Sequence, residues 1–227
     1  MKDLLLLAAS GLAREILADL GDAYRPVGIL DDDSTRHGGR LAGIPILGGI
    51  DRAALHGADL LVCVGSGQGR RRLVERLAGL GVGDDRYATF VSSAAHVPTG
   101  NRVGVGSIVL AGVVLTANVS VGRHVVVMPN VTLTHDNVVD DFVTIAAGVS
   151  LGGAVVLREA SYIGMNASVR QGVEVGRGAT VGMGAVVLQN VPAGETWLNV
   201  PARPISRRPT PDSPVDSPRA VGSGAWS

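Results

Sequence analysis

Apolar residues recur at every sixth position from Val103 to Val187. The first four hexads read VGVGSI, VLAGVV, LTANVS and VGRHVV, and each of the fifteen opens on Val, Leu or Ile. The fifth position is small or apolar in fourteen hexads, with Asn137 the exception, and the fourth is frequently Gly or Asn, which tolerate left-handed backbone at a turn. An amphipathic helix cannot sustain a period of six. The pattern predicts a parallel β-solenoid of five coils, with three hexads per triangular coil and position one pointing inward.

The first ninety residues follow a different pattern. A short apolar strand is expected at residues 4–10, a helix at 11–20 and a second strand at 26–33 that ends in acids. Residues 59–81 repeat the order of strand, glycine turn and helix. These units predict a small parallel, Rossmann-like α/β domain whose turns offer backbone N–H groups to a phosphate. The segment GSGQG departs from the dinucleotide fingerprint G-x-G-x-x-G, which argues against bound NAD.

The expected domain order follows from these two patterns. The α/β domain covers residues 1–90, a linker 91–102 and the all-β solenoid 103–205. Residues 206–227 are rich in Pro, Ser and Asp and cannot contribute a packed element, so they are expected to form a disordered tail.

The charge balance and composition limit the classes of binding partner. Twenty basic and twenty acidic residues leave no excess positive charge for binding nucleic acid or an anionic membrane, which favours a small-molecule or protein partner. The lone Cys63 cannot form an internal disulfide and no targeting segment is evident, so a cytoplasmic protein is expected. No uncharged apolar stretch reaches the roughly 18 residues that span a bilayer.

Residues 103–192 resemble the hexapeptide-repeat acyltransferases, whose left-handed β-helix is built from the unit [LIV]-[GAED]-x-x-[STAV]-x. The same solenoid occurs in γ-class carbonic anhydrases and as a tail on sugar nucleotidyltransferases, so the hexads alone do not fix the function.

Other segments extend the resemblance to most of the chain: ASGLAREI, GILDDD, GIPILG, VGSGQGRR, THD and VPARPI. With them the chain resembles the sugar acetyltransferases of bacterial surface-glycan pathways, namely sialic acid O-acetyltransferases and N-acetyltransferases of nucleotide-linked amino sugars. The resemblance implies that the α/β domain holds the sugar or nucleotide-sugar acceptor. It implies acetyl-CoA as co-substrate along the solenoid, no metal, and a homotrimer with sites between subunits.

His135 is the candidate general base. Acetyl transfer from a thioester requires removal of a proton from the attacking atom, and His135 occupies the outward third position of its hexad. Asp136, carried over from the family's acid, would fix the imidazole tautomer and stabilise the imidazolium. Gly153 lies eighteen residues on and should stack above His135, and its N–H is a candidate oxyanion donor, as in the family. His124, the competing base, occupies a turn position without an adjacent acid and is expected at the surface.

Further residues are expected to bind the two substrates, from the resemblance, from their hydrogen-bonding groups or, for Gln171, from its place one coil beyond Gly153. Those expected to contact the acceptor are Ser10, Gly11, Asp31, Asp32, Ser66 and Arg70. Those expected to contact CoA are Thr144, Gly153, Gln171 and Arg203.

Three positions depart from the family pattern, because Leu12, Met128 and Thr144 replace a histidine, an asparagine and a histidine. These changes would remove polar partners on the acceptor and CoA sides, which leaves open a less polar acceptor or an acyl group other than acetyl.

Two other functions stay open at this stage. A γ-class carbonic anhydrase needs three histidines around zinc, whereas only His124 and His135 lie within the hexads. A noncatalytic solenoid would explain the three departures, but the retained His135, Asp136 and Gly153 favour an enzyme.

Overall fold

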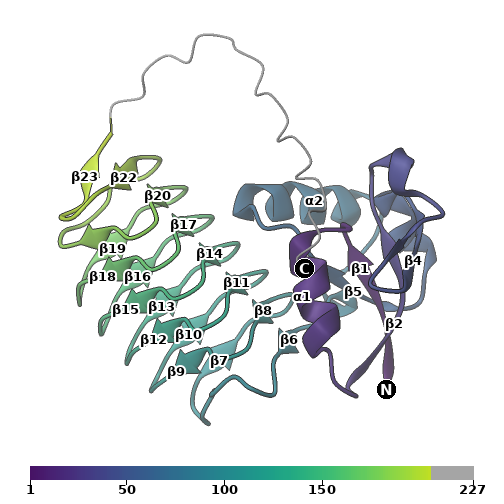
Figure 1. Ribbon diagram of the computed structural model, residues 1–227, viewed down its shortest axis with the longest axis horizontal. Helices are drawn as coiled ribbons and strands as arrows, with labels where there is room; N and C mark the ends of the chain where they lie inside the picture. The colour runs from purple at the N-terminus through teal and green to yellow at the C-terminus, as the bar shows by residue number, and fades with distance from the viewer. Residues whose placement is uncertain (206–227) are drawn as a thin grey trace, which may run out of the picture.

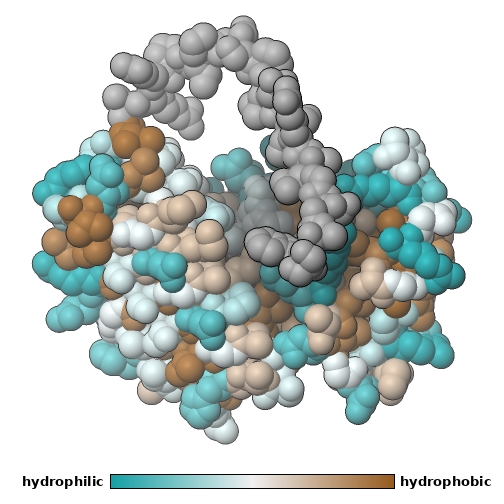
Figure 2. All heavy atoms as spheres, in the orientation of Figure 1, coloured by the Kyte–Doolittle hydropathy of each residue, from teal (hydrophilic) through white to brown (hydrophobic). Residues whose placement is uncertain are grey.

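The computed structural model describes residues 1–205 as two parts, an α/β part beside a three-sided β-solenoid (Figure 1). The expected tail at 206–227 lies outside the described residues. On the face shown in Figure 2, apolar side chains gather near β22 and β23, where Val200 and Ile205 are exposed.

The α/β part is a five-stranded sheet in the order β3-β4-β2-β1-β5, parallel except for the β3–β4 pair. Its elements are β1 Lys2–Leu7, α1 Gly11–Asp19, β2 Tyr24–Leu30, η1 Ser34–Arg36, β3 Arg40–Leu41, β4 Ile44–Gly48, η2 Ile50–Leu55, β5 Asp59–Val62, α2 Gly67–Gly79 and η3 Asp84–Arg86. Strand β1 ends in four leucines, and all four are buried, as expected of a central parallel strand. The Ser10 hydroxyl accepts from the Ala13 N–H and so caps α1, a contact worth about 1 kcal/mol.

The solenoid has three faces in which strands up to β21 pair in parallel with the strand eighteen residues away, as Thr132 does with Ser150. At the C-terminal end β20 pairs with β22 sixteen residues later, and β22 pairs with β23 antiparallel. The first face holds β7 Arg102–Val103, β10 Ser120–Val121, β13 Val138–Val139, β16 Val156–Leu157 and β19 Glu174–Val175. The second holds β6 Phe90–Val91, β8 Ile108–Val109, β11 Val126–Val127, β14 Thr144–Ile145, β17 Tyr162–Ile163, β20 Thr180–Val181, β22 Thr196–Leu198 and β23 Arg203–Pro204. The third holds β9 Val114–Leu115, β12 Thr132–Leu133, β15 Ser150–Leu151, β18 Ser168–Val169 and β21 Val186–Val187.

The roles expected of the hexad positions are confirmed. The first-position residues from Val109 to Val187 are buried and form one continuous core, while Val103 is half-buried. Burying each such side chain contributes about 1.5–3 kcal/mol. The fourth-position residues from Gly106 to Gly184 all have positive φ, including Asp136 at φ 61°. These left-handed residues turn the chain at each corner of the prism.

The segment expected as a linker belongs to the solenoid. Strand β6 pairs with β8 as the first strand of the second face, and His96 forms a bridge with Val114. Residues 91–102 therefore form an incomplete first coil, because their backbone groups pair with the coil that follows instead of remaining free.

The α/β part packs on the second face through a shared apolar core. Leu12 of α1 and Phe90 lie in one buried cluster with Ile108, Leu110 and Val126 of the solenoid. This junction is called the seam below. It covers one face and one corner of the prism and leaves the opposite corner open.

His124 is buried in the seam, so the expectation that it lies at the surface is wrong. Its side chain is fully buried between the rings of Tyr87, centroid distance 4.7 Å, and Phe142, centroid distance 5.3 Å. Neither ring nitrogen has a hydrogen-bond partner among the described residues. Burial is the main cause, with nearby Arg123 and Arg70, that lowers the pKa of His124 to about 4.

We expect the His124 ring to make folding stability depend on pH. The unfolded chain takes up a proton at the ordinary pKa of 6.5, whereas the folded chain does so only near 4. The contribution of His124 to stability is therefore complete well above pH 6.5 and falls by about 3 kcal/mol as the pH drops from there to below 4. Urea unfolding at several pH values measures the slope. His124→Phe, which copies the left-handed Phe142, should remove this component, and an unchanged slope in that variant would contradict the assignment.

Candidate active site

His135 and Asp136 form an exposed pair at the corner between β12 and β13. The His135 Nδ1 lies 2.8 Å from Asp136 Oδ2, and the two side chains are 66% and 52% exposed. The hydrogen bond from Asn118 Nδ2, 2.7 Å, and then that from His135 hold the pKa of the Asp136 carboxyl below its ordinary value. Because the ionised carboxylate can only accept, Nδ1 carries the proton in the neutral ring, and Nε2 of that tautomer has a free lone pair. The imidazole is therefore set up to accept a proton at Nε2.

The corner is fixed by two residues that the sequence reasoning did not assign to the site. Asn118, one coil before Asp136, holds the carboxylate from below. Asn137, the polar exception among the fifth positions, is fully buried and donates from Nδ2 to the Gly152 carbonyl at 2.7 Å. The eighteen-residue spacing could have identified Asn118, whereas the inward orientation of Asn137 is visible only in the folded coil.

Gly153 lies directly above the imidazole, as the coil repeat predicts. A Cβ added at Gly153 would lie 2.4 Å from both Cε1 and Nε2 of His135, so only glycine leaves room for the ring. The Gly153 N–H has no acceptor among the described residues, which keeps it free for a ligand. Gln171, one coil further by register, is exposed. These positions form a column along one corner of the prism, called the His135 column below.

The His135 column lies opposite the seam. Its corner joins the first and third faces, whereas the α/β part packs on the second face and its adjacent corner. In Figure 1 the α/β part accordingly stands to one side of the coils. The chain's own α/β part is therefore separated from His135 by the body of the prism.

Ser10, Gly11 and Asp31 meet at the carboxyl edge of the α/β sheet, where ligands of parallel sheets bind. The Ser10 hydroxyl donates to the Cys63 carbonyl at 2.6 Å, which joins the ends of β1 and β5. Asp31 Oδ2 accepts from the Ala9 N–H at 2.6 Å, which joins the ends of β1 and β2.

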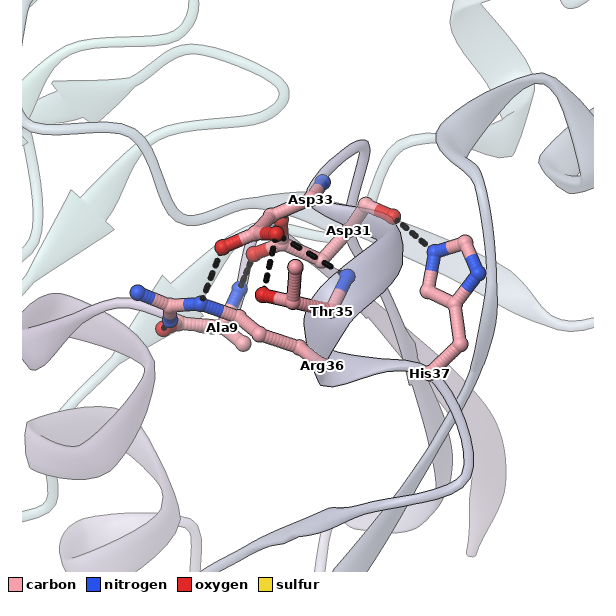
Figure 3. Close-up of polar contacts among 6 residues, drawn as sticks. All are labelled: Ala9, Asp31, Asp33, Thr35, Arg36 and His37. Atoms are coloured by element: carbon pink, nitrogen blue, oxygen red, sulfur yellow. Dashed lines mark hydrogen bonds and ion pairs between the residues drawn. The ribbon is translucent and has the colours of Figure 1, made fainter.

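Asp33, Arg36 and His37, which the sequence analysis did not assign to a site, hold the loop after β2 (Figure 3). Arg36 donates from Nη1 to the Ala9 carbonyl at 2.5 Å and from Nε to Asp33 at 3.1 Å. His37 Nε2 contacts the Asp31 carbonyl at 2.7 Å. The loop is thus fixed against β1 before any ligand arrives.

Asp32 and Ser66 are partly occupied by contacts within the chain. Asp32 forms a two-pronged ion pair with Arg76, at 2.7 and 3.0 Å, which is the main cause that lowers the pKa of its carboxyl. The Ser66 hydroxyl caps α2 by accepting from the Gly69 N–H at 3.3 Å, and its side chain remains exposed.

Arg70 and Thr144 do not reach a ligand site, which corrects their expected roles in acceptor and CoA binding. The Arg70 side chain is fully buried, and Thr144 is 2% exposed with its Oγ1 bonded to the Gly65 carbonyl at 2.8 Å. Both lie in the seam because α2 docks on the corner that they occupy. Arg203 is exposed on β23, on the second face, and the structure does not bring it to the His135 column.

The three departures from the family pattern also belong to the seam. Leu12 is 5% exposed in its apolar core, Met128 packs against that core, and Thr144 bonds to Gly65. The expectation that they remove polar partners from ligand sites does not fit this chain, because their side chains join its two parts.

Within residues 1–205, no three His, Cys, Asp or Glu side chains gather as a metal-binding group. None of the helices in this range is long and apolar enough to cross a membrane.

Comparison with solved structures gives close matches over nearly the whole chain. The acetyltransferase domain of PglB from Neisseria gonorrhoeae, solved with acetyl coenzyme A, is 31% identical, with a TM-score of 0.80 over 90% of this chain and 99% of that chain. WeeI from Acinetobacter baumannii is 26% identical, with a TM-score of 0.80 over 90% of this chain and 100% of its own.

PerB from Caulobacter crescentus, solved with CoA and GDP-perosamine, is 23% identical, with a TM-score of 0.81 over 91% of this chain and 98% of that chain. At this identity the similarity shows the fold alone. No family model and no curated protein matches the chain.

The coiled second part, with its repeating hexads and exposed His–Asp corner, defines a left-handed β-helix acyltransferase, and the expected fold class is confirmed. The chain belongs to the hexapeptide-repeat sugar acetyltransferases. It is accordingly a CoA-dependent acyltransferase.

Proposed function

We propose that the protein transfers an acetyl group from acetyl-CoA to an amino or hydroxyl group of a sugar, with His135 as general base. The observation that carries the proposal is the orientation of the imidazole. Asp136 holds Nδ1 at 2.8 Å, so Nε2 is the free acceptor, and it lies 2.4 Å from where a Cβ added at Gly153 would be. A positioned histidine is the usual proton acceptor for this chemistry.

The proposed reaction proceeds through a tetrahedral intermediate. Nε2 of His135 removes the proton from the attacking nitrogen or oxygen as that atom bonds to the thioester carbon. Asp136 stays ionised and stabilises the imidazolium across the Nδ1 hydrogen bond. The Gly153 N–H donates to the developing oxyanion. When the intermediate collapses, the carbon–sulfur bond breaks and the imidazolium returns the proton to the CoA sulfur.

The geometry supports a site shared between copies of the chain. The acceptor loops around Ser10 and Asp31 belong to the α/β part, whereas His135 lies on the far corner of the solenoid. This separation supports a site to which one copy supplies the acceptor loops and another copy supplies His135. We propose a homotrimer in which acetyl-CoA runs along the His135 column, past Gly153 and Gln171, between neighbouring solenoids.

The proposed acceptor is a nucleotide-linked amino sugar or a sialic acid. The PglB domain was solved with acetyl coenzyme A and PerB with GDP-perosamine, a nucleotide-linked sugar. The carboxyl edge of the α/β sheet, with its preformed Asp31 loop, is suited to a nucleotide or sugar hydroxyls. An amine needs less base assistance than a hydroxyl, and His135 can serve either.

Mass spectrometry of an acceptor panel tests the proposal. Nucleotide-linked amino sugars and free and CMP-linked sialic acids are each incubated with acetyl-CoA and the protein. We expect one acceptor class to gain the mass of a single acetyl group as CoA is released. CoA release only with a longer acyl-CoA would reject acetyl as the donor group. No consumption of any acyl-CoA with any member of the panel would reject these acceptor classes.

A further inference from the structure

Arg70 is a buried cation without a carboxylate partner. It lies in the first turn of α2 with a fully buried side chain, and no carboxylate within residues 1–205 pairs with it. Burial alone lowers its pKa to about 9, so it still carries its charge at neutral pH. Such a group needs hydrogen bonds in every donor direction to remain buried.

The guanidinium finds these bonds in both parts of the chain. Its donations are from Nε to His124 O at 2.8 Å, from Nη1 to Val64 O at 2.8 Å and Gly65 O at 2.9 Å, and from Nη2 to Phe142 O at 3.0 Å, Val143 O at 2.9 Å and Thr144 Oγ1 at 3.0 Å. One planar group thus joins the loop between β5 and α2 to corners of two successive coils.

The loop and the solenoid touch at backbone level beside Arg70. Thr144 Oγ1 donates to the Gly65 carbonyl at 2.8 Å. A Cβ added at Gly67 would lie 2.0 Å from the Phe142 carbonyl oxygen, so this approach is possible only for glycine. These close contacts prevent the loop between β5 and α2 from shifting along the corner of the prism.

The two halves of the seam contribute different constraints. The apolar half, around Leu12 and Val126, favours contact but has no directional preference. The Arg70 half is directional, because six acceptors must fit one fixed fork of donors. The coil that supplies Phe142 and Thr144 also carries His135, so the Arg70 bonds set the acceptor loops against the catalytic coil.

We propose that Arg70 is a positioning residue, which fixes the orientation of the acceptor-binding α/β part on the solenoid without touching substrate. The inference rests on the proposed function. In a trimer of identical copies, the orientation of each α/β part also determines where it presents the acceptor to a neighbouring copy's His135.

Steady-state kinetics of Arg70→Met separates positioning from general damage. We expect kcat/KM for the sugar acceptor to fall about tenfold or more, because misplacement by ~1 Å strongly penalises transfer. The KM for acetyl-CoA and the rate of acetyl transfer to a small amine should stay at the wild-type values. Arg70→Lys keeps the positive charge but loses the planar set of donors, so its kinetics should lie between those of the wild type and Arg70→Met. Arg72 is a neighbouring exposed arginine, and Arg72→Met should behave as wild type.

Hydrogen exchange provides a readout that needs no activity. In Arg70→Met the amides of residues 64–69 should exchange faster than in the wild type, while those of β18 and β21 should not change. If Arg70→Met fails to fold, Thr144→Val removes the hydroxyl that bonds to Arg70 and to the Gly65 carbonyl. This variant should show the same changes on a smaller scale.

Three outcomes would overturn the inference. Unchanged exchange at residues 64–69 would show that Arg70 does not hold the loop. An unchanged kcat/KM for the acceptor in a variant with faster exchange would refute positioning while leaving the proposed function intact. If the wild type itself acetylates no sugar, the proposed function fails, and the role in positioning fails with it.

Discussion

Replacing His135 with Gln is expected to lower kcat by about 10²–10⁴, the usual contribution of a positioned general base. Glutamine retains a polar side chain at the exposed corner but cannot take up the proton that the attacking atom must lose. Because His135 is 66% exposed and supports no buried packing, stability should change by less than about 0.5 kcal/mol. Initial rates at saturating acetyl-CoA and acceptor measure the effect, and thermal unfolding checks the fold.

His96→Gln is the matched control. His96 is an exposed histidine on the incomplete first coil, so its replacement changes the same chemical group without touching the His135 column. It should retain wild-type kcat. A His135→Gln variant that keeps more than about a tenth of wild-type kcat would exclude His135 as the base, since proton transfer would then occur elsewhere.

The solenoid and the His135 column could be predicted from the sequence because both follow from one repeat. A residue's hexad position fixes whether it faces the core, as Leu133 does, or solvent, as His135 does. The register of eighteen fixes what stacks on it, which is why Gly153 could be placed over the imidazole before any coordinates. These contacts are local to neighbouring coils, so periodicity contains them.

The seam could not be predicted in this way. His124 and Thr144 occupy positions that face outward on an isolated prism, and they become buried only because α2 docks on that corner. Arg70 likewise looked like a ligand contact because arginines near a glycine turn often bind phosphate. Three of its actual partners are carbonyls more than fifty residues away in the chain, which no local pattern specifies.

Gly153→Ala is expected to abolish most activity through His135 without unfolding the protein. The new Cβ would lie 2.4 Å from Cε1 and Nε2 of the imidazole, so the exposed ring must swing away from Asp136. Gly153 does not have positive φ, and the atoms in the way belong to an exposed side chain, so alanine should cost little stability. Displacing a base by ~1 Å costs about 10² in kcat, which initial rates will measure.

A double variant determines how Gly153→Ala acts. If the alanine works by displacing the imidazole, it should have no further effect in a His135→Gln background, because the two changes remove one function. Gly57→Ala, where an added Cβ meets nothing within 4 Å, serves as the control and should remain fully active. An equal loss in both backgrounds would mean that the methyl group instead blocks the thioester or its oxyanion. Full activity of Gly153→Ala would contradict the placement of the reaction at this column, since no reacting imidazole could share that space.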